Sequence, residues 1–222
     1  MKRFGKICIV ALPVLMFSSM ASAGILIVNC STVSGPTELT AAAILCPQFN
    51  LAGQTLSNIS IAVSGGITGS ITLTNGDNTT QTGSGTTTTS FNFGALSGFT
   101  FVNPIFSPSF TTGVRTLTAG QTLTVSGLSG SGNGTLGNDT TSFGAYTGAS
   151  NFTIPVSTST FFSSGGTGGF FQAAQASNAN ATGVVTYTYD AVQGIPEPTT
   201  MSVLGLGLLG FGLLARKFNA RK

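Results

Sequence analysis

The sequence Ser57-Asn58-Ile59-Ser60-Ile61-Ala62-Val63 carries the clearest fold signal in this chain. From Ile59 onward every second residue is apolar, which is the period of a β-strand with one buried face. Ser64-Gly65-Gly66 then predicts a turn, and the apolar positions within residues 67–74 predict a strand that returns beside the first. The stretch therefore predicts a β-hairpin and points to an all-β fold class.

The same alternation recurs in Val185-Thr186-Tyr187-Thr188-Tyr189. About eight short segments of this kind, with turns roughly every 8 to 12 residues, indicate a single β-sandwich or jelly-roll-like domain over residues 24–194. Three segments fit this pattern less well. We expect a helical turn within residues 37–45, an exposed or edge strand or a loop at 79–90, and a Gly/Ser loop at 127–138.

The start of the chain predicts a signal peptide over residues 1–23. A basic segment, Met1-Lys2-Arg3-Phe4-Gly5-Lys6, precedes a short apolar stretch, and Ala21-Ser22-Ala23 supplies the small residues expected before cleavage at Gly24. An uncleaved N-terminal membrane helix is the alternative, and the shortness of the apolar stretch disfavours it. We therefore expect the Sec translocon and signal peptidase as partners, and an oxidising compartment as the destination.

Residues 195–221 form a tail with three parts in fixed order. Pro196-Glu197-Pro198 comes first, an uncharged apolar run over residues 201–215 follows, and Arg216-Lys217 closes it. As a helix the apolar run would be about 22 Å long, which is short of the roughly 30 Å hydrocarbon core of a membrane. We predict a transmembrane helix at about 199–215, whose basic end stops transfer and stays in the cytoplasm. Two interpretations remain open, a permanent anchor and a temporary one that is cut.

The order Pro-Glu-Pro, Gly/Leu-rich span and basic end resembles the PEP-CTERM sorting signal of bacterial exported proteins. The resemblance implies processing by an exosortase, an integral-membrane protease or transpeptidase for which the tail is the substrate. It also implies a route from an inner-membrane-anchored precursor to the cell surface or the extracellular matrix.

The body of the chain resembles the choice-of-anchor domain group, type E among them, in which similar β-domains carry different C-terminal sorting tails. No functional residue can be transferred from that group. The matching segments are Leu45-Cys46-Pro47-Gln48-Phe49, Gly53-Gln54-Thr55-Leu56, Gly69-Ser70-Ile71-Thr72-Leu73, Phe143-Gly144-Ala145-Tyr146-Thr147-Gly148 and Val185-Thr186-Tyr187-Thr188-Tyr189.

The formal charge of +3 misrepresents the predicted domain. Seven of the eight basic residues lie in the two terminal signals. The domain keeps Arg115 against Glu38, Asp77, Asp139 and Asp190, so its net charge is −3. A domain without a basic patch lacks the electrostatic footprint of a nucleic-acid binder, and we expect no nucleic acid as partner.

The chain has no histidine, so no His-based triad or metal site is available. Cys30 and Cys46, the two cysteines that remain after the signal peptide, predict a disulfide in an exported protein, with two separate buried thiols as the alternative. The carboxylates are isolated in sequence. Calcium at Asp77 or Asp139 and a hydrolase pair of Glu38 with Asp190 stay open as weaker possibilities.

These observations predict neither an enzyme nor a cofactor or metal centre. The leading hypothesis is a structural or interaction protein of the cell surface or extracellular matrix, with exopolysaccharide as a candidate partner. A carbohydrate-binding surface module is the alternative, and a hydrolase is the weakest of the three.

Overall fold

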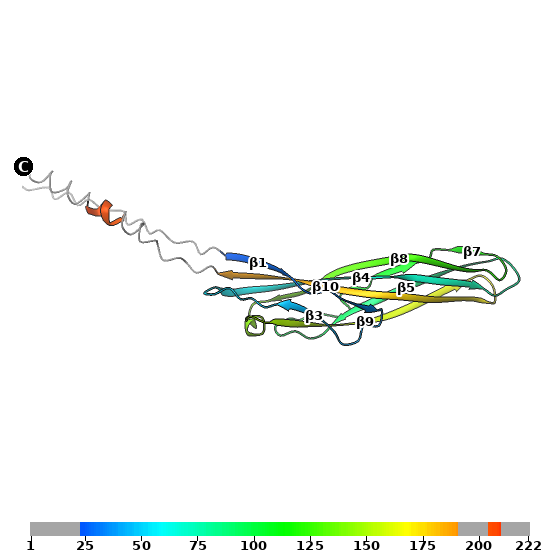
Figure 1. Ribbon diagram of the computed structural model, residues 1–222, viewed down its shortest axis with the longest axis horizontal. Helices are drawn as coiled ribbons and strands as arrows, with labels where there is room; N and C mark the ends of the chain where they lie inside the picture. Colours follow the sequence, from blue (N-terminus) through cyan, green and yellow to red (C-terminus); the bar gives the residue numbers. More distant parts are fainter. Residues whose placement is uncertain (1–22, 191–203, 210–222) are drawn as a thin grey trace, which may run out of the picture. The chain divides into compact units, whose positions relative to one another are not determined.

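The computed structural model describes residues 23–190 and 204–209 (Figure 1). Residues Ala23–Asp190 form one compact unit, and residues 204–209 are helical. Within these described ranges no helix is both long enough and apolar enough to cross a membrane. The predicted span at about 199–215 lies outside the described residues apart from 204–209.

The compact unit consists of β-strands with a single 3-10 turn, so the predicted all-β fold class is confirmed. The elements in chain order are β1 (Ala23–Asn29), β2 (Val33–Pro36), β3 (Ala42–Pro47), β4 (Thr55–Asn75), β5 (Gln81–Phe93), β6 (Ser109–Thr111), β7 (Arg115–Leu117), β8 (Thr122–Asp139), η1 (Phe143–Ala145), β9 (Asn151–Gly166) and β10 (Phe171–Asp190).

The strands form two antiparallel sheets of five strands each (Figure 1). In the sheet called A here, the order is β1-β10-β4-β8, and β2 pairs with β10 beyond the end of β1. In sheet B the order is β3-β9-β5-β6, and β7 pairs with β5. The long strands alternate between the sheets along the chain, because β4, β8 and β10 belong to A whereas β3, β5 and β9 belong to B. The chain therefore passes from one sheet to the other at six of the nine connections between strands.

The inward faces of both sheets share one hydrophobic core. Ile61 of β4 and Val185 of β10 enter it from sheet A, whereas Phe91 of β5 and Ile154 of β9 enter it from sheet B, and all four side chains are fully buried. The period-2 pattern that predicted buried faces at residues 59–63 and 185–189 is thus confirmed. Burial of these alternate apolar side chains is the main favourable term that holds the sheets together.

The predicted hairpin at residues 57–74 is wrong, because both halves belong to the single strand β4. Gly65 and Gly66 continue the strand instead of turning it. A Cβ on Gly65 would lie 2.6 Å from the carbonyl oxygen of Asn180, and one on Gly66 would lie 3.1 Å from that of Gly130. These glycines are required because neighbouring backbones pass close to β4, which is a constraint that the local sequence does not reveal.

The predicted Gly/Ser loop at 127–138 is also wrong, since these residues belong to β8. The inward-facing glycines of β8 lie under the segment that leads into β6. A Cβ would lie 2.4 Å from the carbonyl oxygen of Ser109 at Gly130, 2.8 Å from the Phe106 ring at Gly132 and 2.3 Å from Ile105 at Gly134. The strand uses glycine here because no space is left for side chains.

Two further segments differ from expectation. The helical turn predicted within residues 37–45 is absent, and β3 begins there because Ile44 and Cys46 are buried at alternate positions. The threonine run at 79–90 belongs to β5, which lies between β9 and β6 rather than at an edge. Thr87 and Thr89 are fully buried, and their hydroxyls bond to Gln175 and Thr160 respectively.

A pair of valine truncations tests this assignment of the core. Val185 is fully buried, whereas Val102 is 85% exposed. We expect Val185→Ala to lower the free energy of unfolding by about 2–3 kcal/mol, since two methyl groups are lost and a cavity remains. We expect Val102→Ala to change it by less than about 0.5 kcal/mol. Urea unfolding followed by circular dichroism measures both, and equal effects would contradict the burial described here.

Candidate functional site

The residues predicted to act in export fall at the two ends of the compact unit. Ala23 and Gly24 are the first two residues of β1. Ala21, the sorting motif Pro196-Glu197-Pro198 and the stop-transfer pair Arg216 and Lys217 lie outside the described residues. The structure therefore places only the domain side of each predicted processing site.

The two ends of the unit meet on neighbouring strands. Ala23 pairs with Asp190 across the antiparallel ladder of β1 and β10, and Gly24 pairs with Tyr189 (Figure 1). A Cβ on Gly24 would lie 2.3 Å from the Tyr189 ring, so this ring needs glycine at the position that follows the predicted cleavage site. The chain thus enters and leaves the unit at the same end of sheet A.

The predicted disulfide between Cys30 and Cys46 is present, with an S–S distance of 2.01 Å and a Cα–Cα distance of 4.3 Å. Cys30 directly follows β1 of sheet A, whereas Cys46 is a buried residue of β3 in sheet B. The bridge therefore joins the two sheets covalently. Beside it, the backbone N–H of Ser31 donates to the carbonyl oxygen of Leu45 at 2.8 Å, and the N–H of Leu45 donates to Ser31 Oγ at 2.8 Å.

The four carboxylates of the unit lie in separate places, and three of them accept hydrogen bonds from nearby groups. Glu38 accepts a hydrogen bond from the N–H of Thr160 at 2.8 Å. Asp77 accepts one from Gly169 N–H at 3.2 Å and another from the Gln81 amide. Asp190 ends β10 with an exposed side chain. The described residues contain no group of three or more His, Cys, Asp or Glu side chains that would suit a metal ion.

Asp139 is the one buried carboxylate among the described residues. Burial favours its neutral form, but the backbone N–H groups of Thr141 and Ser142 donate to it at 2.8 and 3.0 Å, and the Thr141 hydroxyl donates at 3.1 Å. These bonds outweigh burial, so the pKa of Asp139 lies below its ordinary value of 3.8. The carboxylate holds the turn that leads from β8 to η1.

The buried tyrosines also serve the fold. The Tyr146 hydroxyl donates to the carbonyl oxygen of Ser97 at 2.6 Å, and the Tyr187 hydroxyl donates to that of Pro47 at 2.7 Å. Burial, with the charge of Asp139 as a smaller cause, raises the pKa of Tyr146 to about 12. Burial likewise raises the pKa of Tyr187, with a smaller contribution from Tyr146. Both side chains therefore stay protonated hydrogen-bond donors in the core.

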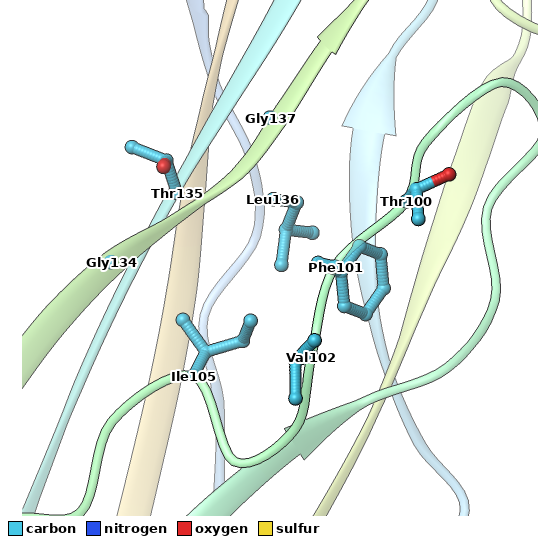
Figure 2. A pocket seen from close by; sticks show the side chains of 8 residues that line it. All are labelled: Thr100, Phe101, Val102, Ile105, Gly134, Thr135, Leu136 and Gly137. Atoms are coloured by element: carbon cyan, nitrogen blue, oxygen red, sulfur yellow. The ribbon is translucent and has the colours of Figure 1, made fainter.

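Figure 2 shows an uncharged pocket of about 350 Å³ between the segment after β5 and the end of β8. Phe101, Val102, Ile105 and Leu136 contribute its apolar side chains, and Thr100 and Thr135 also line it. Asn103 fixes the segment, because its side chain donates to the carbonyl oxygen of Phe93 at 2.8 Å and accepts from the Phe93 N–H at 2.9 Å. None of the residues that line the pocket is charged.

A second pocket, of about 370 Å³, lies beside the start of β9. It too is uncharged. Its lining residues are Gln48, Ala95, Leu96, Ser97, Ala145, Tyr146, Asn151, Phe152 and Thr153. Sequence reasoning missed both pockets, since each is assembled from segments that are distant in the chain and carry no charged or otherwise distinctive residue.

Comparison with known proteins identifies the tail. Residues 194–217 match the sequence model of the PEP-CTERM protein-sorting motif. This motif implies an exported protein that an exosortase processes, and it begins only three residues, 191–193, after the end of β10. Nothing in the comparisons supports the resemblance of the domain to choice-of-anchor proteins.

No curated protein matches the chain. Among solved structures, infectious bursal disease virus strain Gx is 13% identical over 78% of this chain and 38% of the viral chain, with a TM-score of 0.18. Strain Gt of the same virus is 13% identical over 77% of this chain and 38% of the viral chain, with a TM-score of 0.21. The chain thus spans less than two fifths of the length of these viral chains.

Removal of the disulfide tests its role as the link between the sheets. We expect the double change Cys30→Ala and Cys46→Ala to lower the free energy of unfolding by roughly 3 kcal/mol, the value for a closed loop of about 15 residues. Urea unfolding with and without dithiothreitol measures this. The reductant should destabilise the wild-type domain by a similar amount and leave the variant unchanged. A wild-type domain that is indifferent to the reductant would contradict the prediction.

The lowered pKa of Asp139 predicts that the stability of the domain depends on pH under acidic conditions. Because its pKa is lowered in the folded state, its stabilising effect is complete above the ordinary pKa of 3.8 and is lost as pH falls through the lowered value. We expect Asp139→Asn to lower stability at pH 6 and to flatten the loss of stability between about pH 4 and pH 2. Urea midpoints across this range measure the slope. Asp190→Asn, a change at an exposed carboxylate, is the control and should keep the wild-type slope.

Proposed function

We propose that the chain is an exported precursor with three parts: a signal peptide at residues 1–23, a β-domain at 24–194 and a sorting signal at 195–221 with a membrane span at about 199–215. The observation that carries the proposal is the sorting motif at residues 194–217, directly after the last strand of the domain. A stop-transfer end at Arg216 and Lys217 keeps the tail in the inner membrane while the domain lies outside.

Signal peptidase cuts before Gly24 in this proposal, and an exosortase then acts near Pro196-Glu197-Pro198. The domain is released or transferred towards the cell surface or the extracellular matrix. Ala23 pairs with Asp190, so the chain enters and leaves the domain at the same end of sheet A.

The mature domain has a structural or interaction role in that setting and is not an enzyme. Two observations support this. Glu38, Asp77 and Asp139 are each engaged in separate local structures, and the alternation of strands between two sheets that share one core fits a jelly-roll sandwich, an architecture of capsid and lectin domains. Such a domain presents large uncharged sheet faces for contacts with other molecules.

A carbohydrate-binding module is the second candidate. The pocket of Figure 2 favours it, because a lining of apolar, threonine and glycine residues without charge suits a neutral sugar such as a unit of an exopolysaccharide. Binding of the mature domain to a glycan array, and its loss in Phe101→Ala, would select this candidate over a purely structural role. The hydrolase hypothesis has no comparable support.

Mass spectrometry of the exported protein tests the processing step. We expect the wild-type surface form to begin at Gly24 and to lack the tail, and the double change Pro196→Ala and Glu197→Ala to leave the tail in place. The matched control, Thr199→Ala with Thr200→Ala, changes the two residues that follow the motif and should be processed normally. A motif variant that loses the tail as the wild type does would contradict the proposed processing. A wild-type chain that still ends at Lys222 would contradict it as well.

A further inference from the structure

Strand β1 is an uncovered end of sheet A. It pairs with β10 on one side, and no described strand pairs with its other side. Cys30, the residue after β1, donates its backbone N–H to the carbonyl oxygen of Gly183 in β10 at 2.9 Å. Along an antiparallel strand, the backbone N–H and C=O groups of successive residues point to opposite sides. Since those of Cys30 point towards β10, those of Ile25, Ile27 and Asn29 point away from it. β1 thus presents a row of free backbone donors and acceptors.

The side chains along this edge are apolar and exposed. Ile25 is 66% exposed and Ile27 is 63% exposed, whereas the alternate residues Leu26 and Val28 pack against the core. β1 contains no charged residue and no proline, and its register with β10 runs without a shift. Charges, prolines and bulges are the devices that usually keep a sheet edge from pairing with another chain, and β1 has none of them.

The other terminal strands of the two sheets are better protected. The register of β8 shifts twice against β4, which twists its edge. In β3, both backbone groups of Leu45 bond to Ser31. β2 ends in Pro36, and β6 and β7 have three residues each. An unprotected edge with a central apolar run, Ile25 to Val28, is therefore specific to β1 among these strands.

We propose that β1 is a self-association edge, which pairs antiparallel with β1 of a second copy of this chain. In the mature chain, which begins at Gly24, a two-fold axis at Leu26 pairs residues 24–28 of both strands. In this register Ile25 of each copy lies opposite Ile27 of the other copy. The two A sheets then join into one continuous sheet. Such an interface is isologous, since the same patch serves both copies.

A second copy fits this edge better than the chain's own tail. The inference rests on the proposed processing, in which residues 1–23 and the sorting tail are removed. Only residues 191–195 and little more would then follow β10, and a turn back takes at least two of them. Too few would remain to pair along a seven-residue strand.

Charge also permits the pairing. Gly24 pairs with Tyr189, and in the proposed register Gly24 lies opposite Val28 of the second copy. The two Asp190 residues, each next to Tyr189, therefore lie at opposite ends of the shared ladder, about 20 Å apart at roughly 3.4 Å per residue. This separation exceeds the Debye length of about 8 Å at physiological salt, so their repulsion is screened. A five-residue ladder is a small interface, and the association is accordingly weak and favoured where copies are crowded on a surface.

Cysteine cross-linking in the full-length exported protein tests the proposal. In the variant Ile25→Cys with Ile27→Cys, the expected register places the Cα atom of position 25 about 5.5 Å from that of position 27 in the second copy, within the range of a disulfide. The matched control is Ala62→Cys with Ser64→Cys, two exposed residues at the same spacing in β4, which is paired on both sides.

We expect a covalent dimer of twice the monomer mass from the β1 variant on a non-reducing gel, and none above background from the control. Peptide mapping should find the linkage between positions 25 and 27 alongside an intact Cys30–Cys46 bridge. In a second variant, Ile25→Lys with Ile27→Lys, the concentration-dependent increase in sedimentation coefficient of the wild-type protein should disappear, while its circular dichroism spectrum is kept.

No dimer above the control, or an adduct with a protein of another mass, overturns the proposal. A sedimentation coefficient that the lysine variant leaves unchanged overturns it as well. The mass of the reduced monomer reports processing independently. A retained tail therefore counts against the proposed function, whereas an absent dimer counts against the pairing of β1 whatever that mass is.

Discussion

The antiparallel ladder between β4 and β10 is the interaction on which the domain depends. It pairs Thr55–Asn75 with Phe171–Asp190 along nearly their full lengths, and β10 carries β1 and β2 on its other side. Removal of β10 would therefore leave β1 and β2 without a partner and the core open on the side of sheet A. Because β10 is the last strand before the sorting segment, sheet A cannot close until almost the whole domain has been delivered.

Local alternation predicted the fold class and the buried faces correctly. Ile59, Ile61 and Val63 on one strand, and Val185 and Tyr187 on another, are buried as their period indicates. The same reasoning failed at glycine residues. Gly65 and Gly66 read as a turn, but other backbones pass within contact distance of them, and this meaning of a glycine depends on segments far away in the chain. Strand length was therefore underestimated wherever glycine served close packing.

Some of the candidate sites could be predicted from local sequence, whereas the pockets could not. The sorting motif and the cysteine pair are each encoded by short contiguous or paired residues, so the sequence could predict them. The pocket of Figure 2 joins residues 100–105 with residues 134–137, and these segments meet only because β8 and the chain after β5 lie on the same side of the core. Its threonine, glycine and aliphatic residues are common throughout the chain, so no local pattern marks them as a site.

The position of β10 also has a mechanical consequence. Any tether that holds the mature domain by its C-terminal end applies tension to Asp190, and β10 is flanked there by β1 on one side and β4 on the other. Tension along this strand loads many backbone hydrogen bonds at the same time, in shear. When an edge strand is peeled away, by contrast, its hydrogen bonds open one after another. A domain suspended by an inner strand is suited to resist drag at the surface of a cell.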